Sequence, residues 1–295
     1  MGSLKKTALA RGIIHVWFII FSVFCIIPLM YVISISLSKE SDIAQEGYRL
    51  IPKAFTTFAY DYLLKNPEQL LTGYSVSIVV TIAGTVISLV ITAMLAYVLS
   101  RKDFFGSNTL SFIVFFTLLF NGGLVPWYIL VKKYLHLDNT LLALILPYVI
   151  IPWHVLLMRG FLSEIPLALI ESAKIDGARE WRIFYQIVLP IAKPAMATVG
   201  LFISFIYWND WWLAMLYIDN EKLIPLQYML YRIMNNIQYL SSNIKPGNVG
   251  IDISQFPNET ARMAIAIMAA GPILIVFPFF QKYFVKGLTV GAVKG

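Results

Sequence analysis

The stretch GYSVSIVVTIAGTVISLVITAMLAYVL, from Gly73 to Leu99, is apolar along nearly its whole length. A helix rises about 1.5 Å per residue, so about 20 apolar residues are needed to cross the hydrocarbon core of a bilayer. Backbone polar groups must be satisfied inside the lipid, which favours a helix over an open strand. Gly84 and Ser88 form a pair of small residues that predicts close helix packing. The stretch therefore predicts a transmembrane helix.

Five other stretches have the same character. Hydrophobic residues make up 59% of the 295 residues and charged residues only 13%, whereas a soluble protein carries about 25% charge. This composition excludes an ordinary water-soluble fold. We expect an all-α, polytopic transmembrane bundle of six spans. The five further spans are expected at Ile13–Ser36, Leu110–Val131, Thr140–Met158, Ala195–Met215 and Ala264–Tyr283.

The distribution of charge predicts the orientation of the bundle. If the N-terminus is cytoplasmic, the inside segments together with Lys282 hold 13 Lys and Arg against 5 Asp and Glu. This bias follows the positive-inside rule and places both termini in the cytoplasm. The net charge of +7 is therefore explained by basic residues in the cytoplasmic segments, and no nucleic-acid partner is expected.

The predicted spans divide the chain into four parts. We expect a cytoplasmic N-terminal segment at 1–12, a first span and outer loop at 13–72, a core of five spans at 73–283, and a cytoplasmic tail at 284–295. The outer loops at 37–72 and 216–263 are long enough to hold short helices. Turn-forming residues in the second of them are Pro246, Gly247, Gly250 and Pro257.

The inside segment 159–194 is much longer than a connection between two spans requires. Its sequence predicts two short helices separated by Asp176 and Gly177, because glycine accepts the positive φ of a helix end. A single apolar face is predicted on the second helix, formed by Trp181, Phe184, Tyr185 and Val188. This elbow is either a connector packed on its own bundle or a docking element for a cytoplasmic partner.

The run from Glu171 to Pro190 resembles the EAA loop of permeases in binding-protein-dependent ABC importers. The matching residues are Glu171, Ala173, Asp176, Gly177, Ala178, Phe184, Ile187, Leu189 and Pro190. The run departs from the family pattern at Ser172, where the family has alanine. Serine is small enough to preserve close packing.

The resemblance implies a multi-pass protein of the cytoplasmic (inner) membrane with a type I ABC importer permease fold, in which the elbow seats in a cleft of an ATPase subunit. The ATPase-coupling residues that it implies are Glu171, Ala173, Asp176, Gly177, Ala178, Trp181 and Phe184. Implied partners are a second, homologous permease subunit, a dimer of ATP-binding subunits and an extracytoplasmic solute-binding protein.

Other stretches are similar to carbohydrate-uptake permeases, the relatives of the second maltose permease subunit. They are Asn121–Tyr128, Leu137–Pro147, Trp208–Trp212 and Gln281–Gly295. Within that class the chain looks most like permeases of oligosaccharide and polysaccharide importers, including alginate systems. The resemblance implies import of oligosaccharides, including polysaccharide-derived or acidic ones such as alginate, by alternating access.

Polar residues within spans are candidates for a substrate path, because lipid exposure disfavours them. The candidates are Asn121, Tyr207, Trp208, Asn209 and Asp210. Aromatic rings could stack on sugars, and the amide and carboxylate could accept hydroxyl hydrogen bonds. An aromatic belt at the outer interface is the alternative for residues 207–210. For Asn121, which precedes Gly122 and Gly123, the sequence predicts either a kink in the pathway or a helix-packing contact.

The chain contains no phosphate-binding loop of the Gly-x-x-x-x-Gly-Lys-Ser/Thr type. We therefore expect no enzyme activity, and ATP and Mg²⁺ bound only by a partner ATPase. His15, His136 and His154 are scattered, so no metal site is expected. The alternative function is an ATP-independent secondary transporter or channel. Such a protein would use intramembrane charge relays or inverted repeats with broken helices, and the sequence indicates neither.

Overall fold

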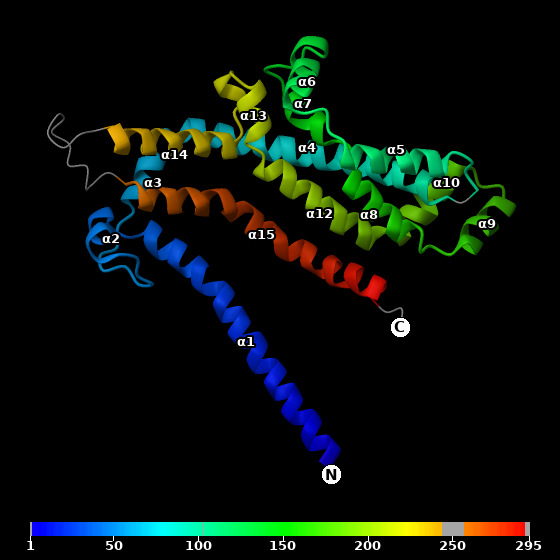
Figure 1. Ribbon diagram of the computed structural model, residues 1–295, viewed down its shortest axis with the longest axis horizontal. Coiled ribbons are helices and arrows are strands. Elements are labelled where there is room, and N and C mark those ends of the chain that lie inside the picture. Colours follow the sequence, from blue (N-terminus) through cyan, green and yellow to red (C-terminus); the bar gives the residue numbers. More distant parts are fainter. Residues whose placement is uncertain (1, 102, 244–256, 293–295) are drawn as a thin grey trace. The chain divides into compact units, whose positions relative to one another are not determined.

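The computed structural model describes residues 2–101, 103–243 and 257–292, which are almost entirely helical. Within these residues no strand forms, and an isolated bridge joins Ser38 and Phe55. Figure 1 shows the course of the helices. The longer elements are α1 (Gly2–Ser36), α4 (Pro67–Ser100), α5 (Ser107–Leu119), α8 (Pro152–Leu162), α12 (Lys193–Asn209), α14 (Leu226–Asn243) and α15 (Glu259–Ala292). The shorter elements are α2 (Glu40–Glu46), α3 (Phe58–Leu63), α6 (Leu124–Ile129), η1 (Leu130–Tyr134), α7 (Leu141–Ile145), η2 (Leu146–Tyr148), α9 (Leu167–Ile175), α10 (Glu180–Ile183), η3 (Phe184–Val188), α11 (Leu189–Ile191), α13 (Trp212–Tyr217) and η4 (Glu221–Leu223).

Three helices of the described chain are long and apolar enough to cross a membrane as single pieces. They are Arg11–Ser36 within α1, all of α4, and Glu259–Pro278 within α15. These helices match the first, second and sixth spans expected from the sequence. Most of the large apolar side chains between Ile13 and Ile33 of α1 are exposed on the isolated chain, as suits a helix whose surroundings are lipid or another subunit.

The remaining candidate spans are bent pairs of helices. The described helices account for up to six spans if each bent pair counts as one. The first pair, Ser107–Leu119 with Leu124–Tyr134, bends by 110°. Its break contains Gly123, with φ +87°, and the Asn121 side chain accepts a hydrogen bond from the Gly123 N–H at 2.8 Å. Glycine tolerates this conformation, so the predicted span Leu110–Val131 is a broken helix.

The other two pairs break at or near prolines. Leu141–Tyr148 and Pro152–Leu162 bend by 51°, and Ile151, which precedes Pro152, has an extended backbone, as a residue before proline prefers. Glu180–Ile191 and Lys193–Asn209 bend by 82°. The predicted span Ala195–Met215 is also interrupted, because α12 ends at Asn209 and α13 begins at Trp212.

Residues 1–67 and 230–271 form one compact unit of the chain. Glu40, at the start of α2, caps the first turn of α15. Its carboxylate accepts hydrogen bonds from the backbone N–H groups of Glu259 (2.9 Å) and Thr260 (3.0 Å), and from the Thr260 hydroxyl (2.9 Å). A negative charge at this end of a helix also interacts favourably with the helix dipole.

Residues 68–229 and 272–295 form the second unit. In it α8 packs against both α12 and α5, and α7 packs against α13. The helix α12 also packs against α4, where Gly84 lies under the ring of Tyr207. The predicted packing role of Gly84 is thereby confirmed. Side chains with almost no exposed surface form the core of this unit, among them Leu99, Val155, Met158, Val199 and Ile203.

The two long predicted loops contain short helices, as expected. The first holds α2 and α3, and the second holds η4 and α14. The turn residues Pro246, Gly247 and Gly250 lie outside the described residues. At the C-terminus α15 continues to Ala292, and the residues after it also lie outside the described part. The boundaries of the four expected parts and the cytoplasmic location of both termini stay predictions.

Candidate functional site

The elbow predicted in segment 159–194 is a helix, a glycine turn and a second helix. The helix α9 ends in a Schellman motif, in which the Ala178 N–H donates to the Ala173 carbonyl at 2.9 Å and the Gly177 N–H donates to the Lys174 carbonyl at 3.0 Å. Gly177 has φ +77°, a conformation that favours glycine at this position of the motif. The break predicted at Asp176 and Gly177 is therefore confirmed.

Several of the predicted ATPase-coupling residues are exposed on the surface of the elbow. Glu171, Asp176, Gly177 and Trp181 are exposed, and Trp181 keeps 65% of its surface accessible. The apolar side chain of Ile175, at the end of α9, is 86% exposed. These residues form the outer surface of the elbow.

The other coupling residues lie inside the elbow. Ala173 and Phe184 are buried and Ala178 is half-buried. The predicted single apolar face was wrong, because Phe184 is buried whereas Tyr185 is exposed. Residues 184–188 form a π-helical turn, whose wider winding separates side chains that an α-helix would place together.

A cluster of five polar side chains attaches the elbow to the end of α4, and we call it the anchor cluster. Its members are Tyr97, Arg101, Asp103, Lys174 and Glu180. The Tyr97 hydroxyl donates to the Glu180 carboxylate at 2.7 Å and accepts from Arg101 Nη1 at 2.9 Å. Lys174 Nζ lies 2.8 Å from Asp103 Oδ2 and 3.0 Å from Glu180 Oε1. Figure 1 shows α10 beside the end of α4 where these contacts form.

Arg101 is the buried centre of the anchor cluster, with 6% of its surface exposed. Its Nε donates to Asp103 Oδ1 at 2.8 Å, and its guanidinium lies over the Tyr97 ring. Hydrogen bonds from Arg101 and Lys174 hold the pKa of Asp103 well below its usual range. Hydrogen bonds to Asp103 and Glu180 raise the pKa of Lys174. The pairing therefore stabilises the charged forms of both Asp103 and Lys174.

Three of the five candidate pathway residues have local structural partners. Asn121 closes the turn before α6, as described above. The Asn209 amide donates to the Phe205 carbonyl one turn earlier, at 2.8 Å. Asp210 accepts from the Tyr148 hydroxyl at 2.9 Å and from the Leu213 N–H at 3.2 Å, so it caps the start of α13.

Tyr207 is a buried packing residue, with 3% of its surface exposed. Its hydroxyl donates to the Ile145 carbonyl at 2.8 Å and lies 2.9 Å from the Ser88 hydroxyl. Its ring also meets the ring of Tyr148 edge-on. These contacts join α12 to α4 and α7, a structural role that the sequence did not indicate for this residue.

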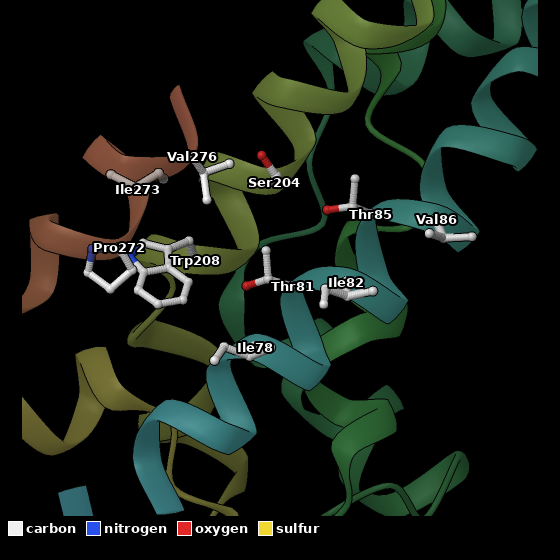
Figure 2. Close-up of a pocket in the computed structure, with 10 residues that line it drawn as sticks. All are labelled: Ile78, Thr81, Ile82, Thr85, Val86, Ser204, Trp208, Pro272, Ile273 and Val276. Carbon is white, nitrogen blue, oxygen red and sulfur yellow. The ribbon is translucent and has the colours of Figure 1, made fainter. Parts of the chain in front are cut away.

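Trp208, the next residue along α12, lines a cavity of about 420 Å³. The walls come from three helices, with Thr81 and Thr85 on α4, Ser204 beside Trp208 on α12, and Pro272 on α15. Figure 2 shows the Thr81 and Thr85 hydroxyls on the side of α4 that faces α12. Most of the wall is aliphatic. Trp208 is therefore the candidate pathway residue that the fold places at a cavity.

Among the residues that the structure describes, no group of three or more His, Cys, Asp or Glu could hold a metal ion. The described polar clusters instead serve as caps, turns and ion pairs. His154, one of the three scattered histidines, is buried beside the ring of Phe202.

Comparison with known proteins places these features in a family. A family described as "Binding-protein-dependent transport system inner membrane component" matches residues 102–290. The chain belongs to this family. The matched range contains the whole elbow, α12, and α15 up to residue 290. The permease is accordingly a multi-pass component of the inner membrane, and its all-α fold agrees with the expectation from the sequence.

Individual relatives match the permease over nearly its full length. The polygalacturonan/rhamnogalacturonan transport system permease protein YtcP of Bacillus subtilis is 36% identical over 290 residues, which cover 98% of this chain and 100% of that protein. The arabinooligosaccharides transport system permease protein AraQ of Halalkalibacterium halodurans is 29% identical and covers 99% of both chains.

A solved structure has the same fold. It is the crystal structure of a bacterial ABC transporter involved in the import of the acidic polysaccharide alginate, and one of its chains is 30% identical to the permease. The match has a TM-score of 0.77 over 92% of this chain and 96% of that chain. The resemblance to binding-protein-dependent ABC permeases is thereby confirmed.

Sequence reasoning missed the anchor cluster. Arg101 belongs to a basic pair that also obeys the positive-inside bias, so topology alone explained its presence. Lys174 and Glu180 carry charges on short helices of the elbow, and the sequence indicates no partner for either of them. Their partners on α4 and in the following loop are 71 to 83 residues away in the chain, and no local periodicity connects them.

Proposed function

We propose that this permease is one membrane-spanning half of an ATP-driven importer that carries oligosaccharides across the cytoplasmic membrane by alternating access. A homologous permease would form the other half, two ATP-binding subunits would bind ATP and Mg²⁺, and an extracytoplasmic solute-binding protein would deliver the substrate. The chain itself would perform no chemical step. Both of its termini would lie in the cytoplasm, on the same side as the elbow.

The observation that carries this proposal is the outer surface of the elbow. Ile175 and Trp181 are large apolar side chains that stand exposed beside a sharp glycine turn. Exposed apolar side chains that are grouped among charged ones are typical of a protein contact surface. The ion pairs of the anchor cluster hold this surface in one position, so a partner could dock on it with little loss of conformational freedom.

Within the elbow the coupling residues would divide their roles. Glu171, Asp176 and Trp181 would contact the ATPase, because their side chains are exposed. Ala173 and Phe184 would hold the two helices together, because they are buried. Gly177 would keep the turn tight enough to fit a cleft, with Ala178 packed beneath it.

The expected substrates are oligosaccharides, including acidic ones released from polysaccharides such as alginate. Two relatives support this class, since one belongs to a polygalacturonan/rhamnogalacturonan system and the other to an importer of the acidic polysaccharide alginate. The indole of Trp208 and the hydroxyls of Thr81 and Thr85 at the cavity offer a stacking surface and hydrogen-bonding groups for a sugar. Asn121, Tyr207, Asn209 and Asp210 would support the path through their structural contacts.

Reconstitution of the whole importer in proteoliposomes tests the proposal. Uptake of labelled alginate and galacturonan oligosaccharides should require ATP and the binding protein, and neutral arabinooligosaccharides serve for comparison. Gly177→Asp and Glu171→Lys should abolish uptake while the permease remains in the membrane. Gly160→Ala is the matched control, since Gly160 is helical and a methyl group there meets no neighbour.

Two outcomes would contradict the proposal. The first is normal uptake by both elbow variants, which would remove the coupling role of the elbow. The second is uptake that continues when the partner ATPase is catalytically inactive and that follows an ion gradient instead. That result would favour the secondary transporter, for which the broken helices of this fold would be suitable elements.

A further inference from the structure

The elbow has two connections to the walls of the Trp208 cavity, and only one of them is covalent. The chain runs directly from α10 through η3 and α11 into α12, which carries Trp208. The opposite wall is α4, which carries Thr81 and Thr85. The helix α4 ends at Ser100, far in sequence from the elbow, so noncovalent contacts must join the two.

We propose that the anchor cluster is the set of positioning residues that makes α4 move together with the elbow during transport. This inference rests on the proposed ATP-driven function, because it assigns to the cluster the transfer of elbow motion to the cavity. Tyr97, Arg101 and Asp103 would receive the motion, and Lys174 and Glu180 would deliver it from the two arms of the elbow.

The contacts of the cluster attach both arms of the elbow. Lys174 lies on α9, before the glycine turn, and its ammonium contacts both Asp103 and Glu180. Glu180 begins α10, after the turn, and accepts the 2.7 Å hydrogen bond from Tyr97. A displacement of either arm therefore acts on the end of α4. Contacts from one arm alone would let the elbow pivot at Gly177 without moving that helix.

The cluster differs from ordinary surface ion pairs, which contribute little to stability or position. Arg101 is buried, and it donates to Asp103, Tyr97 and Glu180. Removing one partner of a buried charge leaves that charge poorly compensated. The Tyr97 ring also packs against Phe184 of the elbow, with 5.3 Å between the ring centroids. The attachment therefore combines a buried charge with apolar contact.

The geometry of α4 makes this attachment effective at the cavity. The helix continues without a break from Pro67 to Ser100, and a helix transmits displacement along its axis because its hydrogen bonds resist extension. Ser88 contacts the Tyr207 hydroxyl between the anchor cluster and the cavity wall, and Gly84 contacts the Tyr207 ring next to Thr85. Motion at Tyr97 would therefore carry Thr81 and Thr85 along with Trp208, and would shift them relative to the third wall of the cavity, which contains Pro272 of α15.

The test is the ratio of oligosaccharide imported to ATP hydrolysed, measured on the complete reconstituted importer. Glu180→Gln keeps an oxygen that can accept from Tyr97 but removes the charge that faces Arg101 and Lys174. Lys174→Met removes the charge of the other arm, and Lys174→Arg restores it. Glu164→Gln is the matched control, because it removes a glutamate charge from an exposed position of the same segment, outside the anchor cluster.

We expect Glu180→Gln and Lys174→Met each to lower the ratio by at least about fivefold, the lower end of typical coupling between sites. Lys174→Arg and Glu164→Gln should keep the wild-type ratio. Tyr97→Phe combined with Glu180→Gln should be no worse than the stronger single variant, because both changes interrupt the same contact.

Three results would overturn the inference. One is a wild-type ratio in every variant. Another is a lower yield of assembled importer with an unchanged ratio in the assembled fraction, which would show a role in folding alone. The last is uptake by the wild-type importer that does not depend on ATP. This result would contradict the proposed function itself, and the wild-type measurement would show it before any variant is compared.

Discussion

Gly84 of α4 lies directly against the ring of Tyr207 of α12, so closely that a Cβ on Gly84 would stand 2.6 Å from the Cζ atom of the ring. The ring cannot turn away freely, because its hydroxyl is bonded to Ser88 and to the Ile145 carbonyl. This contact fixes the distance between two walls of the Trp208 cavity. It also explains why a small residue occurs in the middle of an apolar span.

Gly84→Ala should destabilise the permease by about 1–3 kcal/mol, the usual range for overpacking a buried contact. Thermal unfolding of the purified importer in detergent measures the change, with the amount of assembled complex as a second readout. Gly160→Ala, at an open helical position, should be neutral or slightly stabilising because alanine favours helix. Equal melting temperatures for the two variants would contradict the close packing of Gly84 and Tyr207.

Glu40→Ala should release the first turn of α15, because Glu40 satisfies two backbone N–H groups there. The expected loss is about 1 kcal/mol, as for other helix caps. Hydrogen exchange at the amides of Glu259 and Thr260 should become faster, while exchange in the middle of α15 stays unchanged. Asp42→Asn, at a half-buried carboxylate of the same short helix, is the control. Unchanged exchange at residues 259 and 260 would show that the cap contributes nothing.

Trp208→Ala should reduce transport of a long oligosaccharide more than it reduces basal ATPase activity. The indole forms part of the cavity wall, and its removal enlarges the cavity without touching the elbow. Trp212→Ala is the matched control, since Trp212 is exposed on α13. The comparison requires initial uptake rates and ATPase rates on the same proteoliposomes. Equal loss of both activities, or loss of neither, would argue against a place for Trp208 on the substrate path.

The stability contribution of Asp103 should depend on pH in one direction only. Arg101 and Lys174 lower the pKa of this carboxyl in the folded protein. Its contribution to stability is therefore fully present above its pKa in the unfolded chain, about 3.9, and disappears as the pH falls through its pKa in the folded protein. The difference in melting temperature between wild type and Asp103→Asn should stay constant between about pH 5 and pH 8. Below about pH 4 it should shrink. A difference that varies between pH 5 and pH 8 would point to another titrating group.

The membrane class and the elbow could be predicted from the sequence because both depend on local patterns. Hydropathy over about 20 residues identifies a span, and the pair Asp176 and Gly177 marks a helix end wherever it occurs. A kink at Asn121 was one interpretation of its sequence, whereas the breaks within the other two spans were not predicted. A hydropathy average includes Asn121, Gly123 and Pro152 without recording that each changes the direction of the backbone.

The roles of individual side chains depended more strongly on the tertiary structure. Tyr207 and Trp208 are adjacent aromatic residues that looked alike as candidates for a sugar path. One turns toward Gly84 and the other toward the cavity, because neighbouring residues of a helix point about 100° apart. Both are buried, and only the packing of α4 against α12 decides which of them is held between the helices and which lines the cavity.

By itself, the sequence determined that this protein is a helical membrane protein with a helix–glycine–helix elbow, since apolar length and glycine placement act within a few turns of chain. The tertiary structure alone decided that Tyr97 binds Glu180 and Asp103 binds Lys174, that Glu40 caps α15, and that Gly84 contacts the ring of Tyr207. Each of these contacts joins residues more than 70 positions apart. The two residues of each contact become neighbours only when the helices pack. The charge and size of a side chain specify what it can bind, but they do not specify which distant segment of the chain will lie beside it.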